Sequence, residues 1–274
     1  MSDISEPLIR LGAFVCVLIA LAFWERAAPR RAQSLGRLTR WSSNLCISVL
    51  NTALVRVLLP TTAVGLALVC EAKGWGLLQV YNVPRWLAVV LGFIVMDLAI
   101  YLQHIMFHAA PALWRLHRMH HADQEFDVTT GVRFHPVEVL LSMVLKFAVI
   151  VSVGTPALTV LLFEIMLNAT SMFSHSNVAM PLWLDRVLRW ILVTPDMHRV
   201  HHSIVVRETN SNFGFNLPWW DRLFGTYRPQ PEAGHEGMTL GVKQFRDASE
   251  QRLDRMLTQP LREDARDYPL GRSH

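Results

Sequence analysis

The sequence is short of charged residues and of paired cysteines. Charged residues make up 18% of its 274 positions, against about 25% in a typical soluble domain, so the composition points toward the bilayer. The cysteines, Cys16, Cys46 and Cys70, lie in apolar stretches without a Cys-x-x-Cys spacing. This implies no disulfide framework and indicates buried hydrophobic side chains rather than thiol chemistry. The net charge is only +4 and basic residues stand between apolar runs, so no nucleic acid partner is expected.

Long apolar runs are what the sequence does contain. Three of them occupy residues 8–24, 45–70 and 86–108, and a membrane-spanning helix needs only about 20 residues. We interpret the first as a retained membrane helix rather than a signal peptide, because Asp3 and Glu6 stand where a signal peptide carries basic residues. Within the third run, Asp97 is expected to face the bundle and to pair with a histidine or with Arg56.

A fourth apolar region, 137–173, is split by Gly154, Thr155 and Pro156. Its length predicts a helical hairpin that returns to the side it left. The stretch 25–44 holds five arginines against one glutamate and is predicted to be cytoplasmic by the positive-inside rule. Residues 180–193 predict an amphipathic helix that either lies in the membrane interface or packs on its own protein. The polar tail, 228–274, is expected to be water-exposed and partly helical near 243–258.

Histidine is the unusual residue, with 12 copies. His104 and His108 form H-x-x-x-H at the end of the third run, and H-x-x-H-H occurs twice, at 117–121 and 198–202. At spacings of three and four residues, each set shares one face of a helix. The predicted topology brings all three sets to the side of the arginine-rich stretch. Neutral imidazoles cannot satisfy one another when buried, and protonated ones repel, so metal is expected.

The number of ligands predicts two metal ions, because a tetrahedral ion takes four. Imidazole suits several first-row ions, and the ligand types leave iron, zinc and manganese open. A metal transporter is disfavoured because the histidines gather at one membrane face instead of lining successive spans.

The residues around these histidines resemble the fatty acid hydroxylase/sterol desaturase superfamily of membrane di-iron oxygenases. The resemblance covers roughly residues 85–245. It rests on the order of the three histidine motifs and on four segments: HRMHHADQEFDVTTGVRFHPVE from residue 117, FSHSN from residue 173, TPDMHRVHH from residue 194 and NSNFGFNLPWWDRLFGTY from residue 210.

The resemblance implies two iron ions, with zinc possible as purified, and O2 as co-substrate. Eight implied metal ligands in the catalytic centre are His104, His108, His117, His120, His121, His198, His201 and His202. His175 is the implied ninth. His135 is left open between a ligand or its hydrogen-bond partner and a helix cap, and His235 and His274 are expected to be solvated. Candidate hydrogen-bond partners of the ligands are Asp97, Asp123, Glu125, Asp127, Glu138 and Asp196, and the alternative for each of them is a helix cap or a surface charge. Asn212 or Asn216 could also bond a ligand.

The sequence therefore predicts an all-α, polytopic membrane helical bundle with a cytoplasmic histidine-rich metal-binding cap, as one domain over 1–274. The implied activity is O2-dependent hydroxylation or desaturation of a sterol, fatty-acyl or related membrane lipid. Electrons would come from a separate cytochrome b5-, ferredoxin- or rubredoxin-like protein. We expect the lipid to enter an apolar slot between the spans. Candidate lining residues are Leu140, Met143, Phe147, Phe163 and Met166, and the alternative for each of them is ordinary helix packing. The alternative is a non-catalytic lipid-binding membrane protein with a structural zinc/histidine core.

Overall fold

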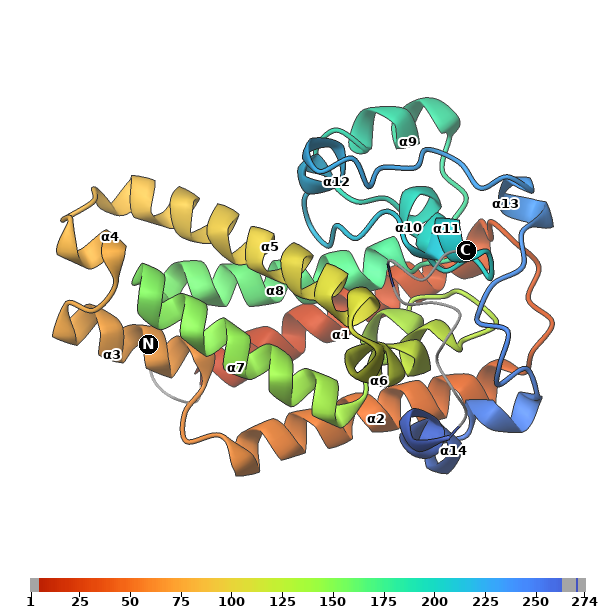
Figure 1. Ribbon diagram of the computed structural model, residues 1–274, viewed down its shortest axis with the longest axis horizontal. Helices are drawn as coiled ribbons and strands as arrows, with labels where there is room; N and C mark the ends of the chain where they lie inside the picture. Colours follow the sequence, from red (N-terminus) through yellow and green to blue (C-terminus); the bar gives the residue numbers. More distant parts are fainter. Residues whose placement is uncertain (1–4, 263–269, 271–274) are drawn as a thin grey trace.

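The computed structural model describes residues 5–262 and residue 270, and every regular element within them is a helix (Figure 1). The long helices lie side by side as a bundle, and all of the short ones except α4 gather at one end of it. The bundle helices are α1 (Ser5–Ala27), α2 (Arg37–Leu58), α3 (Ala63–Lys73), α5 (Arg85–Ala109), α7 (Pro136–Val153) and α8 (Ala157–Ser174). The predicted all-α bundle is confirmed.

Five segments of this bundle are long and apolar enough to cross a membrane, as judged by length and composition. They are Glu6–Ala27, Arg37–Val80, Arg85–Ala109, Pro136–Val153 and Ala157–Ser174. The first predicted span corresponds to α1, which packs on α8 through Leu21 and Met172. It is part of the bundle, as expected of a retained helix.

The second predicted span, 45–70, is wrong at both ends. The helix α2 already begins at Arg37, because Arg40 is buried in an ion pair with the cap. The helix then ends at Leu58, before Pro60, since proline has no N–H to donate and clashes with the preceding turn. Thr62 starts α3 as its N-cap, accepting from the Gly65 N–H at 3.0 Å.

The hairpin predicted over 137–173 is confirmed. The C-cap of α7 is Gly154, whose φ of 73° is the left-handed conformation that favours glycine. The chain then turns back as α8 (Figure 1), and both helices pack on α3 and α5. The tip packs closely on the turn before α4 (Leu77–Val80), because a Cβ on Gly76 would lie 2.1 Å from the Gly154 nitrogen. Both ends of the hairpin therefore reach the same end of the bundle.

The short helices form the cap at that end (Figure 1). They are α6 (Pro111–His121), η1 (Thr130–Val132), α9 (Leu182–Leu188), α10 (Pro195–His201), α11 (Val206–Thr209), α12 (Trp219–Leu223), α13 (Gly234–Gly237), η2 (Ala248–Gln251), α14 (Leu253–Thr258) and η3 (Gln259–Leu261). Arg40 anchors the cap to α2, with bonds of 2.8 Å to Asp123 and 2.7 Å to Asp127.

The helix predicted over 180–193 is shorter and is turned with its polar side inward. The structure buries the Asp185–Arg189 ion pair of α9 and exposes Trp183, Val187 and Ile191. Of the two alternatives for this helix, packing of its apolar face on the rest of the protein is therefore wrong. An outward apolar side is what a helix in the membrane interface presents.

The tail is only partly water-exposed as far as residue 262, because exposed residues alternate there with buried ones. Met256 is fully buried beside Ile47 of α2, and Gln251 receives a hydrogen bond from Arg133 at 2.7 Å. Within the predicted helical stretch 243–258 the helices are η2 and α14, and α13 and η3 lie on either side of it. Scattered apolar residues such as Val242 and Met256 hold this segment against the cap, although they form no sustained apolar run. Residues 263–269 and 271–274 of the predicted tail lie outside the described part of the chain.

Candidate metal centre

The first two histidine motifs meet at the turn between α5 and α6. His104 and His108 lie one turn apart near the end of α5. Pro111 then occupies the first turn of α6, a position that proline tolerates. The chain folds back there, and the ring centroids of His108 and His117 lie 5.1 Å apart.

The other histidines arrive from the ends of α8 and α10. His175 is the C-cap residue of α8. Thr194 begins α10 by accepting from the Met197 N–H at 3.3 Å, and proline follows in the first turn. This short helix carries the third motif, and its C-cap is His202.

The structure brings all nine implied ligands together in two groups. In each group the nearest nitrogen atoms lie within 4.8 Å of one another, and every member is buried. One group contains His104, His108, His117, His121 and His201, and the other contains His120, His175, His198 and His202. Each H-x-x-H-H motif is thus divided between the two groups.

The five-histidine group is oriented by partners on the outer side of its rings. The Nδ1–H of His104 donates to the Phe213 carbonyl at 2.8 Å, and the Nδ1–H of His117 donates to Glu138 at 2.7 Å. His108 donates to the Asn210 side-chain oxygen at 3.1 Å. Such partners fix the tautomer, so that each Nε2 keeps its lone pair.

These lone pairs face one another. The Nε2 atoms of His104 and His117 are 3.0 Å apart, and those of His120 and His175 are 3.1 Å apart. The Nδ1–H groups of both His120 and His175 donate to backbone carbonyls. Two acceptors at this distance repel each other unless a cation lies between them. The donor set therefore fits a metal ion in each group.

Further ring nitrogens are left without a protein partner among the described residues. In the five-histidine group they are the Nε2 atoms of His108, His121 and His201. A buried polar atom without a partner costs about 1–3 kcal/mol, and coordination would supply the missing partner.

Five of the cap histidines are neutral at pH 7, as coordination requires. Burial first, and then repulsion by neighbouring imidazoles, holds the pKa of His120, His121, His198, His201 and His202 well below 6.5. Each ring can therefore offer a lone pair.

Only one of the six predicted carboxylates bonds a ligand histidine in the described structure, and it is Glu138. The prediction for Asp97 is wrong: its oxygens accept from Asn216 and Trp220, both at 2.8 Å, and not from a histidine or Arg56. Asp123 and Asp127 pair with Arg40 instead.

The remaining two predicted carboxylates also have other partners. Glu125 accepts from the backbone N–H of Ser34 at 2.7 Å, and Asp196 pairs with Arg199. Among the asparagine side chains, that of Asn210 bonds His108, whereas those of Asn212 and Asn216 bond other groups. The backbone of Asn212 bonds His198.

Two further histidines have structural surroundings. His135 caps α7, because its Nδ1 accepts from the Val137 N–H at 3.3 Å. His235 was expected to be solvated, but it is buried and lies 3.7 Å from Asp196. His274 lies outside the described residues.

A cavity of about 800 Å³ lies in the bundle beside the histidine groups. Three of its wall residues contact histidine rings: Glu138 bonds His117, Phe134 stacks on His120 at 4.6 Å between ring centroids, and the ring centroid of Phe215 lies 5.1 Å from that of His104. One layer of side chains therefore separates the cavity from the histidines.

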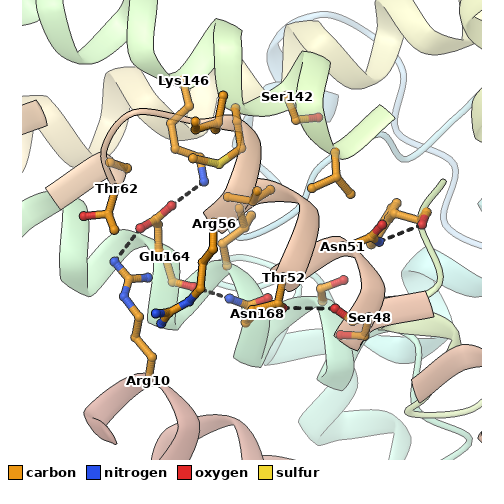
Figure 2. A pocket seen from close by; sticks show the side chains of 18 of the residues that line it. Arg10, Ser48, Asn51, Thr52, Arg56, Thr62, Ser142, Lys146, Glu164 and Asn168 are labelled. Carbon is orange, nitrogen blue, oxygen red and sulfur yellow. Dashed lines mark hydrogen bonds and ion pairs between the residues drawn. The ribbon is translucent and has the colours of Figure 1, made fainter. Parts of the chain in front are cut away.

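The cavity combines the predicted apolar lining with a polar side that was not predicted. Half of the residues that line the cavity have polar side chains, including Arg56 and Lys146 (Figure 2). Of the five predicted hairpin residues, only Met143 is in its wall; Phe147 and Phe163 pack in the core. Sequence reasoning followed the apolar side of each helix and missed the polar side.

The sequence model of the fatty acid hydroxylase family matches residues 89–226, which is half of the chain and includes all nine histidines. The chain belongs to the fatty acid hydroxylase family. This confirms the resemblance seen in the sequence, and the five apolar segments make this family member an integral membrane protein.

The curated relatives act on different lipids. The chain is 34% identical to an ornithine lipid hydroxylase of Rhizobium tropici, over 57% of this chain and 47% of that protein. It is 30% identical to an alkylglycerol monooxygenase of Xenopus tropicalis, over 57% and 34% respectively. It is 26% identical to a cholesterol 25-hydroxylase of Rattus norvegicus, over 60% and 53%. The chain thus spans about a third to a half of these relatives. No solved structure gives a significant match.

Proposed function

We propose that this protein is an O2-dependent oxidoreductase that hydroxylates a C–H bond of a membrane lipid at two iron ions. The observation that supports it best is the pair of buried histidine groups with converging lone pairs, placed beside a cavity among the apolar helices. Hydroxylation is preferred to desaturation because the relatives above are named hydroxylases and monooxygenases. The reaction balances as C–H plus O2, two electrons and two protons, giving C–OH and water.

The proposal assigns iron because zinc has no redox chemistry. Five imidazoles would hold one ion and four the other. Bound iron would supply the capacity to use O2 as an oxidant of an unactivated C–H bond.

The protein's own part is to hold the rings still and to keep water away. Glu138 and the backbone carbonyl of Phe213 fix the orientation of their histidines. Phe126 stacks on His175 at 5.4 Å, and the ring of Phe134 covers His120. Aromatic rings on several sides exclude water, which strengthens electrostatic interactions within the site and limits side reactions.

We further propose that the cap faces the cytoplasm and receives electrons from a separate carrier protein. The segment between α1 and α2 lies at the histidine end and contains Arg30 and Arg31, which is consistent with the positive-inside rule. An iron–sulfur cluster needs several cysteines close together. Cys16, Cys46 and Cys70 lie on three different helices, which supports a separate carrier.

Metal analysis of the purified full chain tests the proposal. We expect about two iron ions per chain, with one ion lost in His120→Ala and the other in His201→Ala, because these residues belong to different groups. His235→Gln, outside both groups, is the matched control. Incubation with bacterial lipid extract, O2 and a reduced ferredoxin should then yield lipids heavier by one oxygen atom.

Zinc that iron cannot replace, together with no O2-dependent product, would favour the alternative of a structural zinc/histidine core in a lipid-binding protein.

A further inference from the structure

The cavity contains a group of charged side chains within the membrane-spanning helices (Figure 2). Glu164 of α8 lies between Lys146 of α7 and Arg10 of α1, with both ion pairs at 2.5 Å. Arg10 also contacts Glu6 at 2.8 Å. Two cations and two carboxylates balance one another in this chain of contacts.

Arg56 adds a positive charge that this balance does not cover. It lines the same cavity from α2, and in Figure 2 its side chain extends toward α8. It has no hydrogen bond or ion pair with any residue in 5–262 or with residue 270. An arginine within the membrane is costly without a counter-charge, and such residues mark binding sites.

The polar wall continues from these charges toward the histidines. On α2 the cavity side consists of Ser48, Asn51, Thr52, Val55, Arg56 and Leu59, spaced as one face of a helix. On α7 the corresponding residues run from Lys146 through Ser142 to Glu138. Eight residues separate Lys146 from Glu138, which is about 12 Å along a helix.

Three acceptors in this wall also lack partners among the described residues. They are the side-chain oxygens Oδ1 of Asn51, Oε1 of Gln103 and Oε2 of Glu138. An alkyl chain could not satisfy them, whereas hydroxyl or amide N–H groups could. A polar ligand therefore fits this part of the cavity better than a hydrocarbon chain does.

The cavity also has an apolar side that reaches the bundle surface. Pro60 at the break between α2 and α3 is exposed, and Leu68 of α3 is 54% exposed; both are in the cavity wall. An acyl chain attached to a bound polar group could leave the cavity here and remain in the bilayer.

We propose that the cavity binds the polar end of an acidic lipid, with Arg56 pairing with its phosphate or carboxylate group and its acyl chains left in the bilayer. This rests on the proposed lipid hydroxylase function and deepens it. Because the wall between Arg56 and the histidine end of the cavity is polar, the carbon to be oxidised then belongs to the polar end of the lipid and does not lie far along an acyl chain.

Lipid binding by the purified full chain in phosphatidylcholine nanodiscs tests the proposal without requiring turnover. The probes are phosphatidic acid, an N-acylglycine and diacylglycerol with matched acyl chains. We expect either or both acidic probes to bind more tightly than diacylglycerol, and the comparison distinguishes phosphate from carboxylate. Arg56→Gln should weaken acidic-lipid binding roughly 10- to 100-fold, since hydrogen bonds to charged groups contribute at this level.

Arg56→Lys should recover part of the affinity, and Arg186→Gln, an exposed arginine on α9 outside the cavity, should change nothing. Equal binding of diacylglycerol and acidic lipids, or unchanged acidic-lipid binding in Arg56→Gln, would overturn the inference even if the protein hydroxylates lipid. Selective binding without any O2-dependent product would instead support the binding site and refute the proposed function. Where product forms, fragmentation should place the new hydroxyl near the polar end.

Discussion

Substitution of Glu138 tests the metal centre most directly, because its carboxylate orients a single histidine, His117, of the five-histidine group. Its Oε1 atom accepts from His117 Nδ1 at 2.7 Å, and both side chains are at most 5% exposed. Glu138→Gln keeps the size and an acceptor oxygen but removes the charge. Glu138→Ala removes the acceptor as well.

The expected losses follow from the strength of this contact. Replacing a partner that orients a ligand lowers metal affinity by about 10–100-fold, and a hydrogen bond to a charged group is roughly twice as strong as a neutral one. We therefore expect about a tenfold loss for Glu138→Gln and a loss near 100-fold for Glu138→Ala, or about 1.4 and 2.7 kcal/mol. The four-histidine group has no bond to Glu138 among the described contacts, so only one of the two ions should be affected.

The assay is metal content per chain after titration of the loaded protein with a chelator. Glu125→Gln is the matched control, because this buried carboxylate accepts from the Ser34 and Leu35 backbone N–H groups at 2.7 and 2.9 Å. Equal retention of metal by Glu138→Ala and Glu125→Gln would refute the reasoning. Loss of both ions together would show that the two groups do not act separately.

Three further predictions concern the cap and its placement. Arg40→Met should lower the unfolding free energy by about 3–5 kcal/mol, because two buried aspartates lose their partner. Denaturant unfolding measures this loss, and in the control Arg37→Met, at a half-buried neighbouring arginine, the loss should stay below about 1 kcal/mol. Burial raises the pKa of Asp221 to about 6 despite hydrogen bonds from two backbone N–H groups and a threonine hydroxyl. The folded state thus binds this proton more tightly than the unfolded chain, so thermal stability should fall as pH rises from about 4 to about 6 and Asp221→Asn should remove this slope. In a cysteine-free background, an impermeant thiol reagent should label Lys73→Cys in intact cells and Ala248→Cys only after lysis; the reverse pattern would contradict the cytoplasmic cap.

Local patterns in the sequence were sufficient for much of the fold. Apolar length gave the spans, and Gly154 with Pro156 gave the hairpin turn, because these features depend on neighbouring residues. The start of α2 could not be found in this way. Its first turns are held by Arg40, whose partner Asp123 is 83 positions away in the chain.

The histidines were predictable and most of their partners were not. Motif spacing and the family resemblance pointed to nine histidines, and the structure gathers them in two groups. The rings of His104, His120 and His175 are oriented by backbone carbonyls, and every residue has a carbonyl, so no residue type marks these positions. His108 uses the side chain of Asn210, which in sequence reads as an ordinary turn residue.

The polar cavity was visible in the sequence but only as a departure from the pattern. Ser48, Thr52 and Arg56 recur every four residues in an otherwise apolar span, and that spacing places them on one helix face. The mean hydropathy of the span does not reveal such a face, because the apolar residues on the lipid side of the same helix keep the average high. Since a polar side chain facing lipid is costly, a polar stripe at helical spacing within a span indicates a surface turned toward the protein interior. Lys146 and Glu164 are isolated charged residues within apolar helices. Their ion pair across the cavity shows that they too face the interior of the bundle.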